Sequence, residues 1–196
     1  EIGVELFGLY TLSMIFIGYA SIFDAGLTRA VVREIALLKN RLDDCNTIIV
    51  TSIIAVVFLG GIGGGGVFLL KDHIIELLNM SPIYYVDAIK SLILLSSLIP
   101  VFLVTQILLA ELEGREYFGI LNIQKSLGNS LIAGLPALFV LINQTLFSAI
   151  IGVAIARVIC LWLSYIMSRK RITIDISFFS ITVLKRLFRY GGWVTI

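Results

Sequence analysis

Four long stretches without a charged side chain dominate this sequence. They cover residues 6–23, 45–70, 91–110 and 126–156. A helix needs about 20 apolar residues to cross the hydrocarbon core of a bilayer. Stretches of this length, repeated along the chain, predict a bundle of membrane-spanning helices.

The composition agrees with this prediction. Hydrophobic residues make up 59% of the 196 residues and charged residues 14%, against roughly 45–50% and about 25% in an ordinary soluble domain. A globule of this size cannot bury so much apolar surface. These values exclude a soluble enzyme, a disordered chain and a secreted disulfide scaffold.

The fourth stretch is too long for one helix, because it has 31 residues. Asn143-Gln144 interrupts it, and we place a tight turn at 143–146. The sequence then predicts an all-α membrane bundle with five complete spans, near residues 6–23, 46–70, 91–110, 117–142 and 147–168. A linker at 169–190 leads to the start of another span near residue 191, so we expect the chain to be a fragment of a longer protein.

Lys and Arg are distributed unequally among the connections. Eleven lie in segments 24–44, 111–116 and 169–190, and two lie in segment 71–90. Cytoplasmic connections carry the excess of Lys and Arg in membrane proteins. We therefore expect the first three segments to face the cytoplasm, and an earlier helix to precede residue 6.

Arg157 lies close to the middle of the last complete span, about 16 Å from either end at 1.5 Å per residue. A charge at this depth costs at least about 2.5 kcal/mol, so it should face a water-filled cavity, a protein partner or an anionic substrate. The alternative is a structural pair with a carboxylate or with carbonyl groups of another helix.

Polar residues recur at helical spacing in the span before it. This polar stripe consists of Asn122, Lys125, Ser126, Asn129 and Ser130. Such a stripe is unsuited to lipid, and it should line a cavity or join helices. Alternatively, the helix begins later and Lys125 reaches the membrane surface.

Six glycines between Gly60 and Gly66 contain a chance GxGxxG pattern. A nucleotide fingerprint requires a preceding strand, which a membrane span does not provide. Close helix packing through pairs such as Gly60 and Gly64 is the favoured interpretation. At the inner end of the first span, we expect Asp24 to pair with Arg29 or Arg33.

Catalytic and metal-binding patterns do not occur in the sequence. His73 is the single histidine, and Cys45 and Cys160 lie in or beside apolar stretches, where small buried residues are expected. No Walker sequence is present, and a net charge of +2 does not indicate nucleic-acid binding. We expect a protein that is not an enzyme and that needs no metal or cofactor.

Three segments resemble one transporter family. They are Gly3–Tyr10 followed by Gly18–Ala30, Glu111–Gly119 and Phe188–Trp193. In this order they resemble bacterial polysaccharide flippases, the Wzx-type members of the multidrug/oligosaccharidyl-lipid/polysaccharide (MOP) exporter superfamily. The resemblance implies helices two to six of an N-terminal six-helix lobe and the start of helix seven.

The resemblance also implies a function. Members of this type move an undecaprenyl-pyrophosphate-linked oligosaccharide across the bacterial or archaeal cytoplasmic membrane by alternating access. Membrane lipids, a polysaccharide polymerase and chain-length proteins are then expected partners. Two alternatives stay open, an ion-coupled multidrug exporter of the same superfamily and a membrane scaffold that transports nothing.

Side-chain chemistry assigns candidate roles within that function. Arg157 and Lys125 would stabilise the pyrophosphate, and the neutral stripe residues Asn122, Ser126, Asn129 and Ser130 would bind sugar hydroxyls. Arg29 and Arg33 would collect the headgroup at the inner mouth, although a cytoplasmic location explains both residues equally well.

Overall fold

A computed structural model describes residues 11, 24, 26–38, 41–77, 84–169 and 172–194. The described chain is helical and contains no strand. Its elements are α2 (Leu27–Leu38), α3 (Leu42–Leu77), α4 (Tyr85–Gly114), α5 (Phe118–Ile142), α6 (Leu146–Ser168), the short 3-10 helix η3 (Ile176–Phe178) and α7 (Ile181–Val194). The expected first span, 6–23, lies outside the described residues apart from Thr11.

The all-helical membrane fold is confirmed. Among the described residues, α3, α4, α5 and α6 are each long and apolar enough to cross a bilayer. Asn143–Thr145 separate α5 from α6, and the Thr145 hydroxyl caps α6 by accepting a hydrogen bond from the Ser148 amide at 3.1 Å. The interruption at Asn143-Gln144 is therefore a turn between two helices, as predicted.

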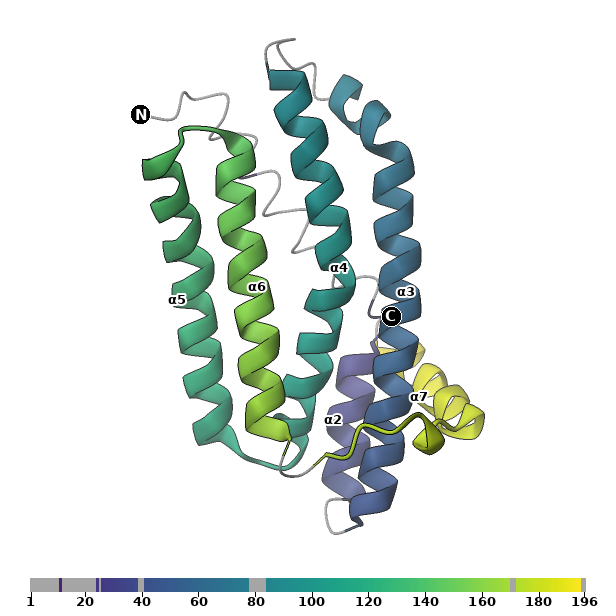
Figure 1. Ribbon diagram of the computed structural model, residues 1–196. Coiled ribbons are helices and arrows are strands. Elements are labelled where there is room, and N and C mark those ends of the chain that lie inside the picture. The colour runs from purple at the N-terminus through teal and green to yellow at the C-terminus, as the bar shows by residue number, and fades with distance from the viewer. Residues whose placement is uncertain are drawn as a thin grey trace.

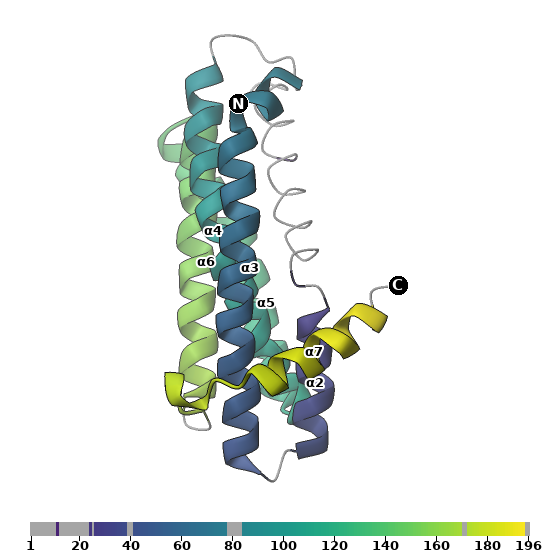
Figure 2. The same cartoon turned by 90° about the vertical axis from the view of Figure 1, so that its right-hand side faces the viewer.

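The four long helices stand side by side, in the order α5, α6, α4, α3 (Figure 1). Consecutive helices run in opposite directions, so α3 with α4 and α5 with α6 form two antiparallel hairpins. Helix α4 joins the hairpins because it packs against both α3 and α6. Helices α2 and α7 lie beside the N-terminal half of α3, and α7 crosses that helix obliquely (Figure 2).

Both hairpins have a close crossing in which a glycine of one helix meets a proline of the other. A Cβ atom at Gly60 of α3 would lie 2.9 Å from the Cα atom of Pro100 on α4, and one at Gly64 would overlap the Ser96 carbonyl group. A Cβ atom at Gly152 of α6 would lie 2.7 Å from Pro136 of α5. The expected packing role of Gly60 and Gly64 is confirmed, because only a residue without a side chain fits these crossings.

Among the described residues, the largest apolar core is formed by α2, α3, α4 and α7. It includes Leu27, Val31 and Ile35 of α2, together with Leu187 of α7. Gly26 begins this unit with φ +74°, and a Cβ atom there would lie 2.5 Å from the Gly191 carbonyl oxygen. Residues 172–194, expected as a linker and the start of a span, are thus packed against α2 and α3.

Candidate functional site

Arg157 lies in the contact between α6 and α4. Its guanidinium carbon is 4.7 Å from the centroid of the Phe102 ring, which is a cation–π distance. Its Nε atom is buried and has no hydrogen-bond partner in the described part of the chain. The aromatic ring offsets part of the desolvation of the cation, and the buried N–H group leaves capacity to bind a hydrogen-bond acceptor.

Three contacts fix how α5 and α6 are aligned. Gln124 Nε2 donates to Ser164 Oγ at 2.7 Å, Gly128 faces Cys160, and Pro136 faces Gly152. All three belong to the same antiparallel register. In this register Arg157 is level with residue 131, directly beyond Ser130 of the polar stripe. Lys125 lies about 9 Å closer to the end expected to be cytoplasmic, at 1.5 Å per residue.

The exposed surface of α5 has two chemically different flanks. The buried residues Gln124 and Gly128 face α6, and buried Leu121 packs against Leu109 and Leu112 of α4. Asn122, Lys125 and Asn129 lie one position after them, and one residue turns a helix by about 100°. Ser126 and Ser130 lie one position further, on the outward face of the helix. Ile123 and Leu127 are exposed one position before the buried residues, on the opposite flank. Helix α5 therefore presents an apolar flank suited to lipid and a polar flank at Asn122, Lys125 and Asn129 suited to water or to a polar ligand, with Ser126 and Ser130 on the outward face between the two flanks.

All members of the polar stripe are exposed. Asn122, Ser126, Asn129 and Ser130 form no side-chain hydrogen bond within the described residues, so their amide and hydroxyl groups are available for binding. Lys125 Nζ lies 3.8 Å from Glu113 Oε2, with both side chains nearly half exposed. This pair directs the Lys125 charge toward the last turn of α4.

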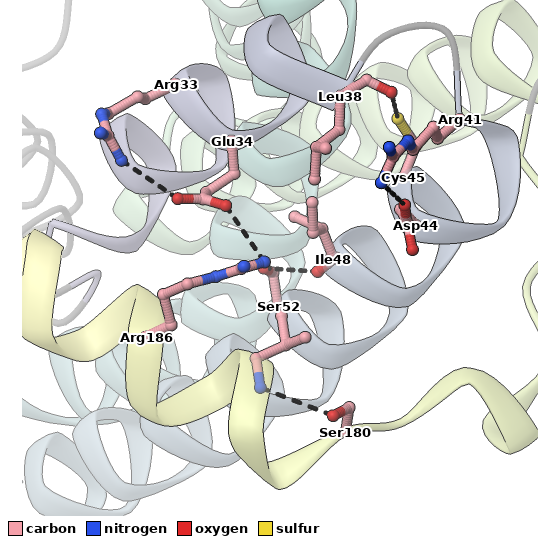
Figure 3. Close-up of polar contacts among 11 residues, drawn as sticks. Arg33, Glu34, Leu38, Arg41, Asp44, Cys45, Ile48, Ser52, Ser180 and Arg186 are labelled. Atoms are coloured by element: carbon pink, nitrogen blue, oxygen red, sulfur yellow. Dashed lines mark hydrogen bonds and ion pairs between the residues drawn. The ribbon is translucent and has the colours of Figure 1, made fainter.

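Arg29 and Arg33 lie on α2, apart from the polar stripe. Arg29 is exposed. Arg33 donates to Glu34 at 3.1 Å and stacks over the Tyr190 ring of α7 at 4.5 Å. Glu34 also pairs with Arg186 of α7 at 3.1 Å, so one buried carboxylate connects the two helices (Figure 3). Arg33 is therefore part of the contact between α2 and α7.

The expected pairing of Asp24 with Arg29 or Arg33 is wrong for the described contacts. Both Asp24 carboxylate oxygens accept from the Thr28 amide, at 3.0 and 3.1 Å. Asp24 thereby satisfies an amide in the first turn of α2, which would otherwise lack an intrahelical partner. A short acidic side chain just before a helix is a common cap, and the position of Asp24 two residues before Gly26 is the sequence signal for this role.

A buried polar cluster at the ends of α4 and α6 was missed from the sequence. Glu111 is fully buried, lies 2.6 Å from Arg115 Nε, and accepts a hydrogen bond from Ser168 Oγ at 3.0 Å. The spacing of Glu111 and Arg115 is four residues, which is the spacing of an ion pair within a helix. That spacing was visible in the sequence, but the burial was not.

Comparisons with known proteins identify the family. The whole chain, residues 1–196, matches the family described as "Polysaccharide biosynthesis protein". A protein of Shigella flexneri named "Putative O-antigen transporter" is 40% identical over 195 residues, which is 100% of this chain and 47% of that protein.

Solved structures share the fold. An inward-facing multidrug resistance MATE family transporter of the MOP superfamily superposes with a TM-score of 0.77 at 18% identity. The alignment covers 97% of this chain and 46% of that one. An outward-facing structure of such a transporter gives 0.76 at 19% identity, over 97% and 44%. The chain thus spans about half the length of the proteins it matches.

The family match covers the full sequence, and a relative is 40% identical. Both findings agree with the all-helical membrane fold and with the resemblance of the three sequence segments. At these sequence identities, the solved transporters add evidence about the fold alone. The chain belongs to the polysaccharide biosynthesis protein family, and it has the helical fold of MOP-superfamily transporters.

Proposed function

We propose that the complete protein is a flippase of the bacterial cytoplasmic membrane. It moves an undecaprenyl-pyrophosphate-linked oligosaccharide from the cytoplasmic to the outer leaflet by alternating access. Family membership and the name of the Shigella relative support the substrate class. The fold shared with transporters solved in inward-facing and outward-facing states supports the mechanism.

Arg157 is the observation that carries this proposal. A pyrophosphate cannot cross hydrocarbon without compensation of its charge, because desolvating an ion costs many kcal/mol. Arg157 supplies a cation at mid-span whose Nε–H group has no partner in the described part of the chain. Guanidinium groups bind phosphate oxygens through several directed hydrogen bonds. In this proposal Arg157 contacts the pyrophosphate as it passes the middle of the membrane.

The polar stripe of α5 is proposed to hold the sugars. Asn122, Ser126, Asn129 and Ser130 are exposed and lie between the depth of Arg157 and the cytoplasmic end. Lys125, in the same stripe, would contact the pyrophosphate at an earlier stage, at the cost of its weak pair with Glu113. Arg29 would attract the headgroup from the inner surface. Arg33 would do so after leaving its contacts with Glu34 and Tyr190.

The test uses the complete gene in a deletion strain of the source cell. Arg157→Ala should abolish surface polysaccharide and trap the lipid-linked oligosaccharide on the cytoplasmic leaflet, with an unchanged amount of protein in the membrane. Arg157→Lys keeps the charge without the planar donor set and should restore transport in part.

Arg169→Ala is the matched control, because Arg169 is exposed directly after α6. It removes the same charge from the cytoplasmic end and should leave transport unchanged. Normal polysaccharide in the Arg157→Ala strain would refute the role of Arg157. Normal polysaccharide after deletion of the whole gene, with no redundant flippase, would refute the flippase function. A polymerase and chain-length proteins are the partners that this function implies.

A further inference from the structure

A second surface, separate from the site at Arg157, lies on residues 174–189. Five large apolar side chains are exposed there: Ile174, Ile176, Phe179, Ile181 and Phe188. The exposed fraction reaches 79% at Ile176 and 56% at Ile181. Apolar side chains exposed at this density are typical of a surface that contacts another molecule or a membrane.

The same surface is basic. Lys185 and Arg189 are exposed and form no ion pair with the described residues. Arg186 points the other way, toward Glu34 (Figure 3). Asp175 is the only acidic residue between positions 172 and 194. Exposed apolar side chains interspersed with cations match the chemistry of an anionic membrane surface.

The docking of α7 determines which of its faces points outward. Val183, Leu184 and Leu187 pack into the core formed with α2 and α3. Ile181, Lys185 and Phe188 follow each other at intervals of four and three residues, so they share another face of the helix. The outward face of α7 thus carries two apolar groups around one cation.

Hydrogen bonds to α3 set the depth of this surface. The Thr173 amide donates to Asn46 Oδ1 at 3.2 Å, and the Ser180 amide donates to Thr51 Oγ1 at 3.1 Å. Asn46 and Thr51 lie in the first ten residues of α3, where this helix is expected to enter the bilayer from the cytoplasm. Helix α7 crosses α3 obliquely at this level (Figure 2). Lipid headgroups occupy this depth of a membrane.

We propose that residues 174–189 form a contact surface for anionic lipid headgroups of the cytoplasmic leaflet. Lys185 and Arg189 contact the lipid phosphates, and the exposed apolar side chains enter the boundary between headgroups and acyl chains. This surface is distinct from the proposed transport site, and its occupant is a bilayer lipid. The inference does not depend on transport activity.

The test uses the full-length protein with a fluorescent nitrobenzoxadiazole label at Ile176→Cys. Cys45 and Cys160 are buried, and any cysteine outside residues 1–196 is replaced by serine, so that the label reacts at position 176. The protein is reconstituted into phosphatidylcholine vesicles in which one lipid is brominated and quenches the label. The brominated lipid is either anionic phosphatidylglycerol or zwitterionic phosphatidylcholine, at about 20% in both cases, roughly the anionic fraction of a cytoplasmic leaflet. Quenching by the brominated phosphatidylglycerol should be at least about two-fold stronger, because two cations enrich the anionic lipid locally.

The double variant Lys185→Gln/Arg189→Gln should quench equally with both lipids. Lys90→Gln is the matched control, because Lys90 is exposed on the expected outer side and makes no ion pair with described residues. It should keep the two-fold preference. Equal quenching in the unsubstituted background would overturn the proposal. Absence of quenching by either lipid would also overturn it, and would indicate that another part of the protein or a second copy covers the surface.

A measurement without the label guards against variants that fold poorly. Phosphatidylglycerol that remains bound to the purified protein is counted by mass spectrometry. The double variant should retain less of it than the Lys90→Gln protein at equal monodispersity, and equal retention would refute the inference.

Discussion

The buried pair of Glu111 and Arg115 at the end of α4 offers a test of how a buried ion pair contributes to the stability of the fold. Glu111 is fully buried and Arg115 nearly so, and their charged atoms are 2.6 Å apart. Removing one partner of a buried pair leaves the other charge desolvated, which costs about 3–5 kcal/mol. We therefore expect Glu111→Gln alone to lower the free energy of unfolding of the full-length protein by about 3 kcal/mol. Arg115→Met alone should lower it by less, because Glu111 keeps its hydrogen bond from Ser168.

The double variant isolates the interaction between the two groups. It leaves neither charge unpaired, so its loss should be smaller than the sum of the single losses by about 2 kcal/mol, within the range measured for interacting residues. Unfolding by sodium dodecyl sulfate in mixed micelles, followed by circular dichroism, measures all three variants.

Ser168→Ala is the matched control, because it removes one hydrogen bond to Glu111 and leaves both charges in place. It should cost about 1 kcal/mol. Single losses that add up in the double variant would refute the reasoning, since they would show that the two charges stabilise the fold independently.

Three further predictions concern other parts of the chain. Gly64→Leu should lower the free energy of unfolding by about 1–3 kcal/mol through overpacking against α4. Gly65→Leu is the control, because nothing lies within 4 Å of its Cβ position, and it should change the free energy of unfolding little in the same assay. Hydrogen bonds from Ser177 hold the pKa of Asp175 below its usual 3.8. Protection of the Ser177 amide from hydrogen exchange should therefore persist above about pH 4 and be lost as the pH falls below it. Asp175→Asn should abolish this pH dependence. Glu34→Gln should speed hydrogen exchange throughout α7 because it removes the carboxylate that binds the helix to α2; unchanged exchange would show that apolar contacts alone hold α7.

Much of the fold could be predicted because the bilayer imposes a simple rule on sequence. Uncharged stretches of sufficient length identify the regions of α3, α4, α5 and α6, and a polar Asn143-Gln144 pair is unfavourable in lipid unless it forms a turn. The packing role of Gly60 and Gly64 also follows from the sequence, since small residues four apart allow two helix backbones to approach closely.

The contacts outside the spans could not be predicted from the sequence, because the bilayer imposes no comparable rule there. The segment before α7 is held by hydrogen bonds to Asn46 and Thr51, more than 120 positions earlier in the chain. Long-range hydrogen bonds of this kind have no local sequence signature.

Part of the candidate site followed from the sequence. A mid-span arginine and a polar stripe at helical spacing are anomalous in lipid, so Arg157 and the α5 stripe could be named from their positions alone. Their relative depths, with Arg157 level with residue 131, required the register of α5 against α6. The contribution of Phe102 could not be foreseen, because an aromatic residue in an apolar stretch is indistinguishable from its neighbours until α4 and α6 are placed together.

The shared register of α5 and α6 limits how the gene can change over evolution. One inserted residue inside α5 would turn everything beyond it by about 100° and shift it by 1.5 Å. Gln124, Gly128 and Pro136 could then no longer meet their partners on α6 together. Insertions and deletions among relatives should therefore collect in the turn at 143–145, while the interval from Gln124 to Pro136 keeps a constant length.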